Sequence, residues 1–138
     1  MFSPDGRWVA YESDESGRHE TYVRPASGPG GKVPISTEGG TEPVWSRNGR
    51  ELFYRNGDKM MAAAIETKPA IAAAKPNLLF EGHYETGFYP FLANYDVSPD
   101  GQRFLMVKAS GKESVATQLN VVLNWFEELK ERVPAERK

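Results

Sequence analysis

The chain has 138 residues, of which 39% are hydrophobic and 26% charged, a balance typical of one soluble globular domain rather than of a disordered or membrane-spanning chain. Lys and Arg number 17 against 19 Asp and Glu, so the net charge of −2 provides no basic excess for binding nucleic acid. Cysteine is absent, which excludes disulfide bonds and thiolate metal sites.

The first residues carry no targeting signal, because residues 1–6 lack the basic and apolar stretches of a signal peptide. No apolar run approaches the roughly 18 residues that a membrane span needs. We therefore expect the chain as written to stay in the cytoplasm without inserting into a membrane. If it is a fragment of a longer protein, residues outside it set the natural compartment.

One turn followed by one strand occurs three times, at residues 2–13, 45–55 and 97–108. The turn serines are 43 and 52 residues apart, a spacing that fits whole blades of a β-propeller rather than single hairpins. Pro presets φ early in the turn, Asp or Asn bonds the nearby backbone, and Gly adopts a positive φ. We expect nine structural turn residues: Ser3, Asp5, Gly6, Ser46, Asn48, Gly49, Ser98, Asp100 and Gly101.

Short strands separated by turn residues continue after each repeat and predict four-stranded units. The expected strands are 8–13, 20–24, 32–36, 42–45, 51–54, 59–65, 77–80, 95–97, 103–108 and 119–124. They divide into a first blade over 1–39, a second over 40–82, a third over 93–124 and a C-terminal helix over 125–133. The fold class predicted is therefore all-β, a partial propeller of about three blades whose first and last are incomplete.

The Ser-Pro-Asp-Gly turn at 3–6, the Trp-Val-Ala-Tyr-Glu-Ser strand at 8–13 and the Thr-Tyr-Val-Arg strand at 21–24 resemble the TolB-like, WD-repeat-related propeller family. Residues 123–130 resemble the C-terminal end of such propellers in multidomain bacterial proteins. Many of those proteins carry a serine/threonine kinase or a DNA-binding domain upstream. The resemblance thus implies the C-terminal portion of a bacterial propeller.

The number of blades predicts association, because closed propellers typically have about 4–8 blades and this chain supplies about three. An open arc exposes apolar sheet faces and unpaired strand edges. We expect a fragment or short descendant of a six-bladed protein, completed as a homodimer or higher homo-oligomer. The helix at 125–133, capped by Asn124, either packs on its own propeller or docks a partner.

Residues for catalysis or metal binding do not converge in the sequence. The two histidines, His19 and His83, are far apart, and no Gly-x-Ser-x-Gly motif provides a nucleophile. No zinc-ligand spacing occurs, and backbone bonding explains the turn carboxylates better than calcium does. The Gly-rich residues 28–33 lack the first Gly and the Ser/Thr of a phosphate loop. We expect no enzyme activity, metal or cofactor.

Aromatic residues concentrate in the irregular stretch 81–92, between the second and third blades. Propeller loops at such positions commonly bind partners, and aromatic side chains are favoured at interaction hot spots. The alternative is that the rings fill the core between blades. The candidate binding residues are Arg24, His83, Tyr84, Phe88, Tyr89 and Phe91.

These observations favour a non-catalytic protein-interaction or sensing module that resembles the C-terminal half of a TolB-like propeller. One alternative is a propeller accessory domain of a larger enzyme, either a serine/threonine kinase or a prolyl-oligopeptidase-type peptidase. Another is a binder of small ligands or carbohydrates that uses the aromatic loop. The residues name no specific partner.

Overall fold

The structure, a computed structural model, describes residues 1–67, 70–86 and 92–108. These residues form an all-β structure, as the sequence predicts. The strands are β1 (Trp8–Ser13), β2 (Glu20–Pro25), β3 (Val33–Pro34), β4 (Thr41–Trp45), β5 (Glu51–Asn56), β6 (Lys59–Glu66), β7 (Ala72–Ala73), β8 (Asn77–Glu81), β9 (Tyr95–Val97) and β10 (Phe104–Met106).

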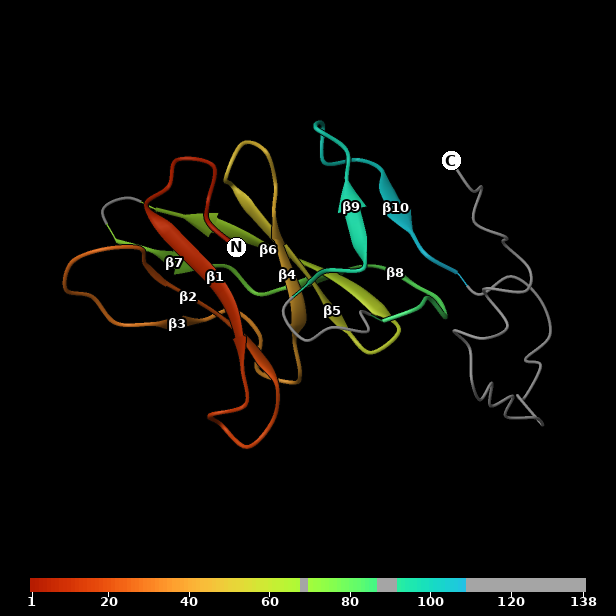
Figure 1. Ribbon diagram of the computed structural model, residues 1–138, viewed down its shortest axis with the longest axis horizontal. Helices are drawn as coiled ribbons and strands as arrows, with labels where there is room; N and C mark the ends of the chain where they lie inside the picture. The colour runs from red at the N-terminus through yellow and green to blue at the C-terminus, as the bar shows by residue number, and fades with distance from the viewer. Residues whose placement is uncertain (68–69, 87–91, 109–138) are drawn as a thin grey trace, which may run out of the picture.

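The strands form three antiparallel sheets that follow one another in chain order (Figure 1). The N-terminal sheet contains β1, β2 and β3. The central sheet has the order β4-β5-β6-β7, with β8 pairing with the other end of β6. The C-terminal hairpin contains β9 and β10. The described sheets do not close into a barrel, and the central sheet lies between the other two.

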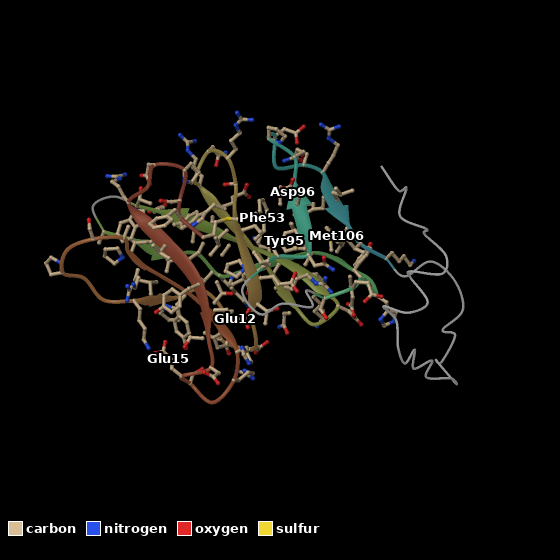
Figure 2. The ribbon with its side chains drawn as sticks, in the orientation of Figure 1. Glu12, Glu15, Phe53, Tyr95, Asp96 and Met106 are labelled. Atoms are coloured by element: carbon tan, nitrogen blue, oxygen red, sulfur yellow. The ribbon has the colours of Figure 1, made fainter. Side chains whose placement is uncertain are left out.

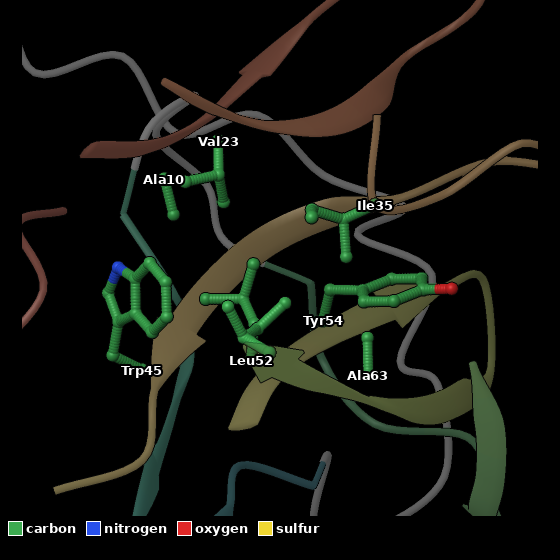
Figure 3. Packing of buried hydrophobic residues seen from close by; sticks show 8 residues of the cluster. Ala10, Val23, Ile35, Trp45, Leu52, Tyr54 and Ala63 are labelled. Atoms are coloured by element: carbon green, nitrogen blue, oxygen red, sulfur yellow. The ribbon is translucent and has the colours of Figure 1, made fainter. Parts of the chain in front are cut away.

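The N-terminal core lies between the N-terminal and central sheets. Ala10 and Val23 point into it from one sheet, and Leu52, Tyr54 and others meet them from the central sheet (Figure 3). All of these side chains are buried, and Ala10, Val23 and Leu52 are fully so. Alternate residues of a strand point to opposite faces, so this core takes every second residue of β5.

The hairpin core lies on the opposite face of the central sheet. Phe53 and Met60 enter it from the central sheet, and Tyr95 and Phe104 enter it from the hairpin. The Phe53 and Phe104 rings meet edge to face with their centroids 5.1 Å apart. β5 is therefore buried on both of its faces.

Most strand positions in the described residues agree with the sequence prediction, and the differences have local causes. The predicted strand 32–36 shortens to two residues at Pro34, which has no N–H to donate. A short strand, β7, lies in the connection between β6 and β8, where the sequence predicts no strand. The first turn is preceded only by a single bridge, Phe2 to Val9, in place of a full innermost strand.

The predicted strand 119–124 and the predicted helix 125–133 lie outside the described residues. A membrane-crossing helix is not found in the part of the chain that the structure describes.

Candidate functional site

The repeated turn is held by its serine hydroxyl. In the turn at Ser46, the hydroxyl donates to Asn48 Oδ1 at 2.9 Å and accepts the Glu51 N–H at 2.9 Å. The same Asn48 oxygen accepts the Arg50 N–H at 2.9 Å. Gly49 has a φ of 70°, a conformation that side chains other than Gly rarely adopt. The side chains of the turn therefore bond one another and the backbone.

The other two turns repeat this arrangement with a carboxylate in place of the amide. The Ser3 hydroxyl donates to Asp5 at 2.6 Å, and the Ser98 hydroxyl donates to Asp100 at 2.5 Å. The Ser3 hydrogen bond, aided by Arg7, lowers the pKa of Asp5 to about 2. The Ser98 hydrogen bond likewise lowers the pKa of Asp100. The geometry gives the turn carboxylates a structural role in bonding the turn.

Arg24 lies on the outward face of the N-terminal sheet, opposite Val9 in the register of β1 and β2. It is exposed and has no hydrogen-bond or ion-pair partner among the described residues. On the same face, the rings of Tyr11 and Tyr22 stack with centroids 5.7 Å apart, and the Lys32 ammonium lies 4.9 Å from the Tyr22 ring centre. We call these five residues the N-terminal face.

His83 and Tyr84 follow β8 at the other end of the structure. His83 is 93% exposed, and its Nδ1 lies 2.7 Å from Asp58 Oδ2. The half-buried Tyr84 ring meets Phe80 edge to face at 6.1 Å and borders a cavity of about 450 Å³ between the central sheet and the hairpin. Phe104 lines the same cavity. One side of the Tyr84 ring therefore packs on Phe80, and another side borders the cavity.

A buried arginine on β5 holds the segment that follows β8 in place. Arg55 is only 1% exposed. Its guanidinium donates to the Gly57 carbonyl at 2.9 Å and to the carbonyls of Tyr84 and Glu85 at 3.4 Å. An arginine can satisfy several carbonyls at once because its donors form a rigid fork. The position of Tyr84 thus depends on a charge inside the protein.

The candidate binding residues do not form one site in the described structure. Arg24 lies on the N-terminal sheet, whereas His83 and Tyr84 lie beside the central sheet and the hairpin. The remaining three candidates, Phe88, Tyr89 and Phe91, lie outside the described residues. Any recognition surface that includes Arg24 is therefore distinct from one that includes Tyr84.

Glu42 joins all three sheets and was not singled out in the sequence. It has a φ of 54° in the irregular first half of β4. Its N–H donates to Glu12 on β1, its carbonyl accepts the Tyr95 hydroxyl at 2.8 Å, and its carboxylate accepts the Asn94 N–H at 2.9 Å. A non-Gly residue in this region costs about 1–3 kcal/mol, which these tertiary contacts offset.

A second cavity, of about 320 Å³, lies beside Glu42. Met1, Tyr11 and Glu12 also line it. The carboxylate of Glu12 is already bound to the His19 ring at 2.7 Å and to the Glu42 N–H at 3.2 Å. The charged groups at this cavity therefore serve to join the sheets.

The outward face of the C-terminal hairpin was also missed by sequence reasoning. Leu105 is 74% exposed, and Asp96 lies directly opposite it in the register of β9 and β10. Figure 2 shows Asp96 on the hairpin, at the opposite end of the molecule from β1. We call this pair the outer hairpin face. The available signal was that Phe104, Leu105 and Met106 are all apolar, so that strand presents apolar side chains on both of its faces.

Each histidine pairs with a carboxylate, as in the Ser-His-Asp triad of a hydrolase, which also needs a serine nucleophile. His19 bonds Glu12 and His83 bonds Asp58, both at 2.7 Å. Across residues 1–67, 70–86 and 92–108, no serine hydroxyl is hydrogen-bonded to either imidazole. The same ranges hold no cluster of three or more His, Asp or Glu side chains suited to a metal ion.

The sequence matches no known family model and no curated protein.

Proposed function

We propose that the chain is a non-catalytic protein-interaction module, built as a partial β-propeller and resembling the C-terminal half of a TolB-like propeller. The proposal rests on sheets that stack in chain order, each with one copy of the same turn, which leads into β1, β5 or β10. Stacking of successive antiparallel sheets is how propeller blades bury their faces. Among the described residues, three sheets form an open arc, which leaves one face at each end for a partner.

One observation carries the binding role: Leu105 is 74% exposed at the centre of a β-hairpin. Its counterpart in the second repeat, Phe53, is 1% exposed because the hairpin covers it. Val107, two residues further on, is also 48% exposed, so the apolar exposure extends beyond one residue, and exposed apolar patches are typical of interaction surfaces. We infer that a protein covers Leu105 in the functional state.

A binding role also agrees with how the polar groups are used. The turn carboxylates bond their own turns, Glu42 joins sheets, and Arg55 holds backbone carbonyls. These contacts create a rigid scaffold on which surface residues are displayed. The proposal assigns catalysis, where it occurs, to a partner.

Site-specific photo-crosslinking tests the function. A photo-reactive residue replaces Leu105 in one variant and Tyr11 in another. Leu78 is the control because it is 52% exposed on β8 and belongs to neither face. We expect a protein adduct from positions 105 and 11 after irradiation in cells, with little from position 78. An adduct with a kinase or peptidase would favour an accessory role in an enzyme. Absence of any protein adduct from both face positions would refute the binding function.

A further inference from the structure

The direction in which each side chain packs follows one rule, counted from the turn serine. Leu52 and Tyr54 are the sixth and eighth residues after Ser46, and both enter the core shared with the preceding sheet. Phe53, the seventh residue, enters the core shared with the following sheet. The rule follows from strand alternation, because even and odd positions face opposite ways.

The first and third repeats obey the same rule on the sides where they have a neighbour. Ala10, seventh after Ser3, packs toward the central sheet that follows. Phe104 and Met106, sixth and eighth after Ser98, pack against the central sheet that precedes. Successive sheets are therefore stacked in one polarity, with the even positions of one sheet on the odd positions of the sheet before.

Two faces remain without a neighbour among the described residues, and they are of complementary kinds. Val9 and Tyr11 are the even positions of the first repeat, on the N-terminal face. Leu105 is the odd position of the third repeat, on the outer hairpin face. Inside the chain, odd Ala10 is fully buried and odd Phe53 is 1% exposed, against 74% for Leu105. The N-terminal face is thus of the kind that packs on an odd-position face inside the chain, and the outer hairpin face is of the kind that packs on an even-position face.

We propose that a second copy of this chain covers these faces, with the N-terminal face of each copy stacked on the outer hairpin face of the other. This proposal rests on the proposed function and names its partner. The contact of Phe53 with Phe104 is its template. In the assembly, Leu105 takes the place of Phe53, and Val9 of the other copy takes the place of Phe104.

Charge also matches between the two faces. Arg24 is an exposed cation beside Val9, without a partner among the described residues. Asp96 is an exposed anion opposite Leu105, and one of its carboxylate oxygens accepts the Val97 N–H. Complementary charges at the rim of an interface favour the correct register and speed association.

The stacking is head to tail, so it either closes into a ring or continues as a filament. Two copies of a three-sheet chain give six sheets, which lies within the range of about 4–8 blades in closed propellers. A ring of two leaves neither face open. The expected species is therefore a dimer of twice 15.4 kDa.

Light scattering with size-exclusion chromatography tests the assembly on the full chain at tens of micromolar. Leu105→Asp blocks the outer hairpin face because it places a second carboxylate beside Asp96, and Val9→Asp blocks the N-terminal face because it removes the apolar contact and pairs Arg24 within its own copy. Each should weaken association at least about a hundred-fold. Leu78→Asp, on β8, is the control. Arg24→Glu replaces Val9→Asp if thermal unfolding shows that variant to be misfolded. We expect the wild type and Leu78→Asp to be dimers and both face variants to be monomers.

Mixing the two face variants gives the decisive result. The Leu105→Asp copy keeps an intact N-terminal face and the Val9→Asp copy keeps an intact outer hairpin face, so one interface reforms and a heterodimer is expected. A wild-type monomer, a face variant that stays dimeric, or a mixture that does not associate would each overturn the head-to-tail assembly. A wild-type monomer that still forms a crosslink from position 105 to another protein would leave the proposed function intact.

Discussion

Replacing the turn serines by alanine shows how much the burial of a hydrogen bond adds to its contribution to the free energy of unfolding. Ser46 is 3% exposed, and Ser46→Ala leaves the Glu51 N–H without its acceptor in a partly buried place. An unsatisfied buried donor costs about 1–3 kcal/mol, so we expect a loss of about 2 kcal/mol in the free energy of unfolding. In the exposed turn at Ser98, water replaces the hydroxyl toward the Arg103 N–H, and Ser98→Ala should cost about 0.5 kcal/mol.

Urea denaturation measures both losses, provided that the slope of free energy against urea is unchanged. Ser27→Ala is the matched control, because Ser27 is exposed in the connection between β2 and β3. It should leave the free energy of unfolding unaltered. The reasoning is refuted if the Ser98 variant loses as much as the Ser46 variant, because burial would then not decide the cost.

Two further predictions concern buried groups of the central sheet and the hairpin. Burial raises the pKa of Tyr54 to about 12, and burial together with Glu42 raises the pKa of Tyr95. An unfolded tyrosine ionises near 10.0, so the unfolded state loses its protons at a lower pH than the folded state does. The free energy of unfolding should therefore decline as the pH rises from about 10 to about 12. Tyr54→Phe should flatten that decline in urea titrations at successive pH values, and an unchanged slope would contradict the assignment. Arg55→Met should lower the free energy of unfolding by about 2 kcal/mol, because the carbonyls that Arg55 binds lose a charged donor. It should also speed amide hydrogen exchange in residues 82–86 more than in β2. Exchange rates in residues 82–86 that are the same in the variant and the wild type would show that the guanidinium does not hold this segment.

Local features of the fold could be predicted because their causes lie within a few residues. In the turn at Ser46, the hydrogen bonds of the serine, Asn48 and Gly49 go to one another and to the adjoining backbone. Such a turn forms wherever its sequence occurs, so three copies predicted three hairpins. The same reasoning placed β5 and β6 correctly, since the turn at Gly57 joins two apolar runs.

The candidate binding surface could be predicted less well, because it depends on segments far apart in the chain. Arg24 and Tyr84 were grouped as candidates, yet Arg24 lies on β2 of the N-terminal sheet and Tyr84 lies in the segment that follows β8. Arg55 was not singled out in the sequence, where the predicted strand ends at Tyr54, but the chain beyond β8 folds back over it and supplies carbonyls. No periodicity within β5 indicates that a charged residue there is buried.

The sequence by itself determined an all-β chain with three repeated turns, because turn chemistry and strand alternation are local. It also determined that Phe53 and Leu105 are equivalent, since each is the seventh residue after its turn serine. Only the tertiary structure decided that Phe53 is covered and Leu105 is exposed. The physical reason is that a sheet face is buried only when another sheet packs on it. The residues of one strand do not encode whether another sheet follows.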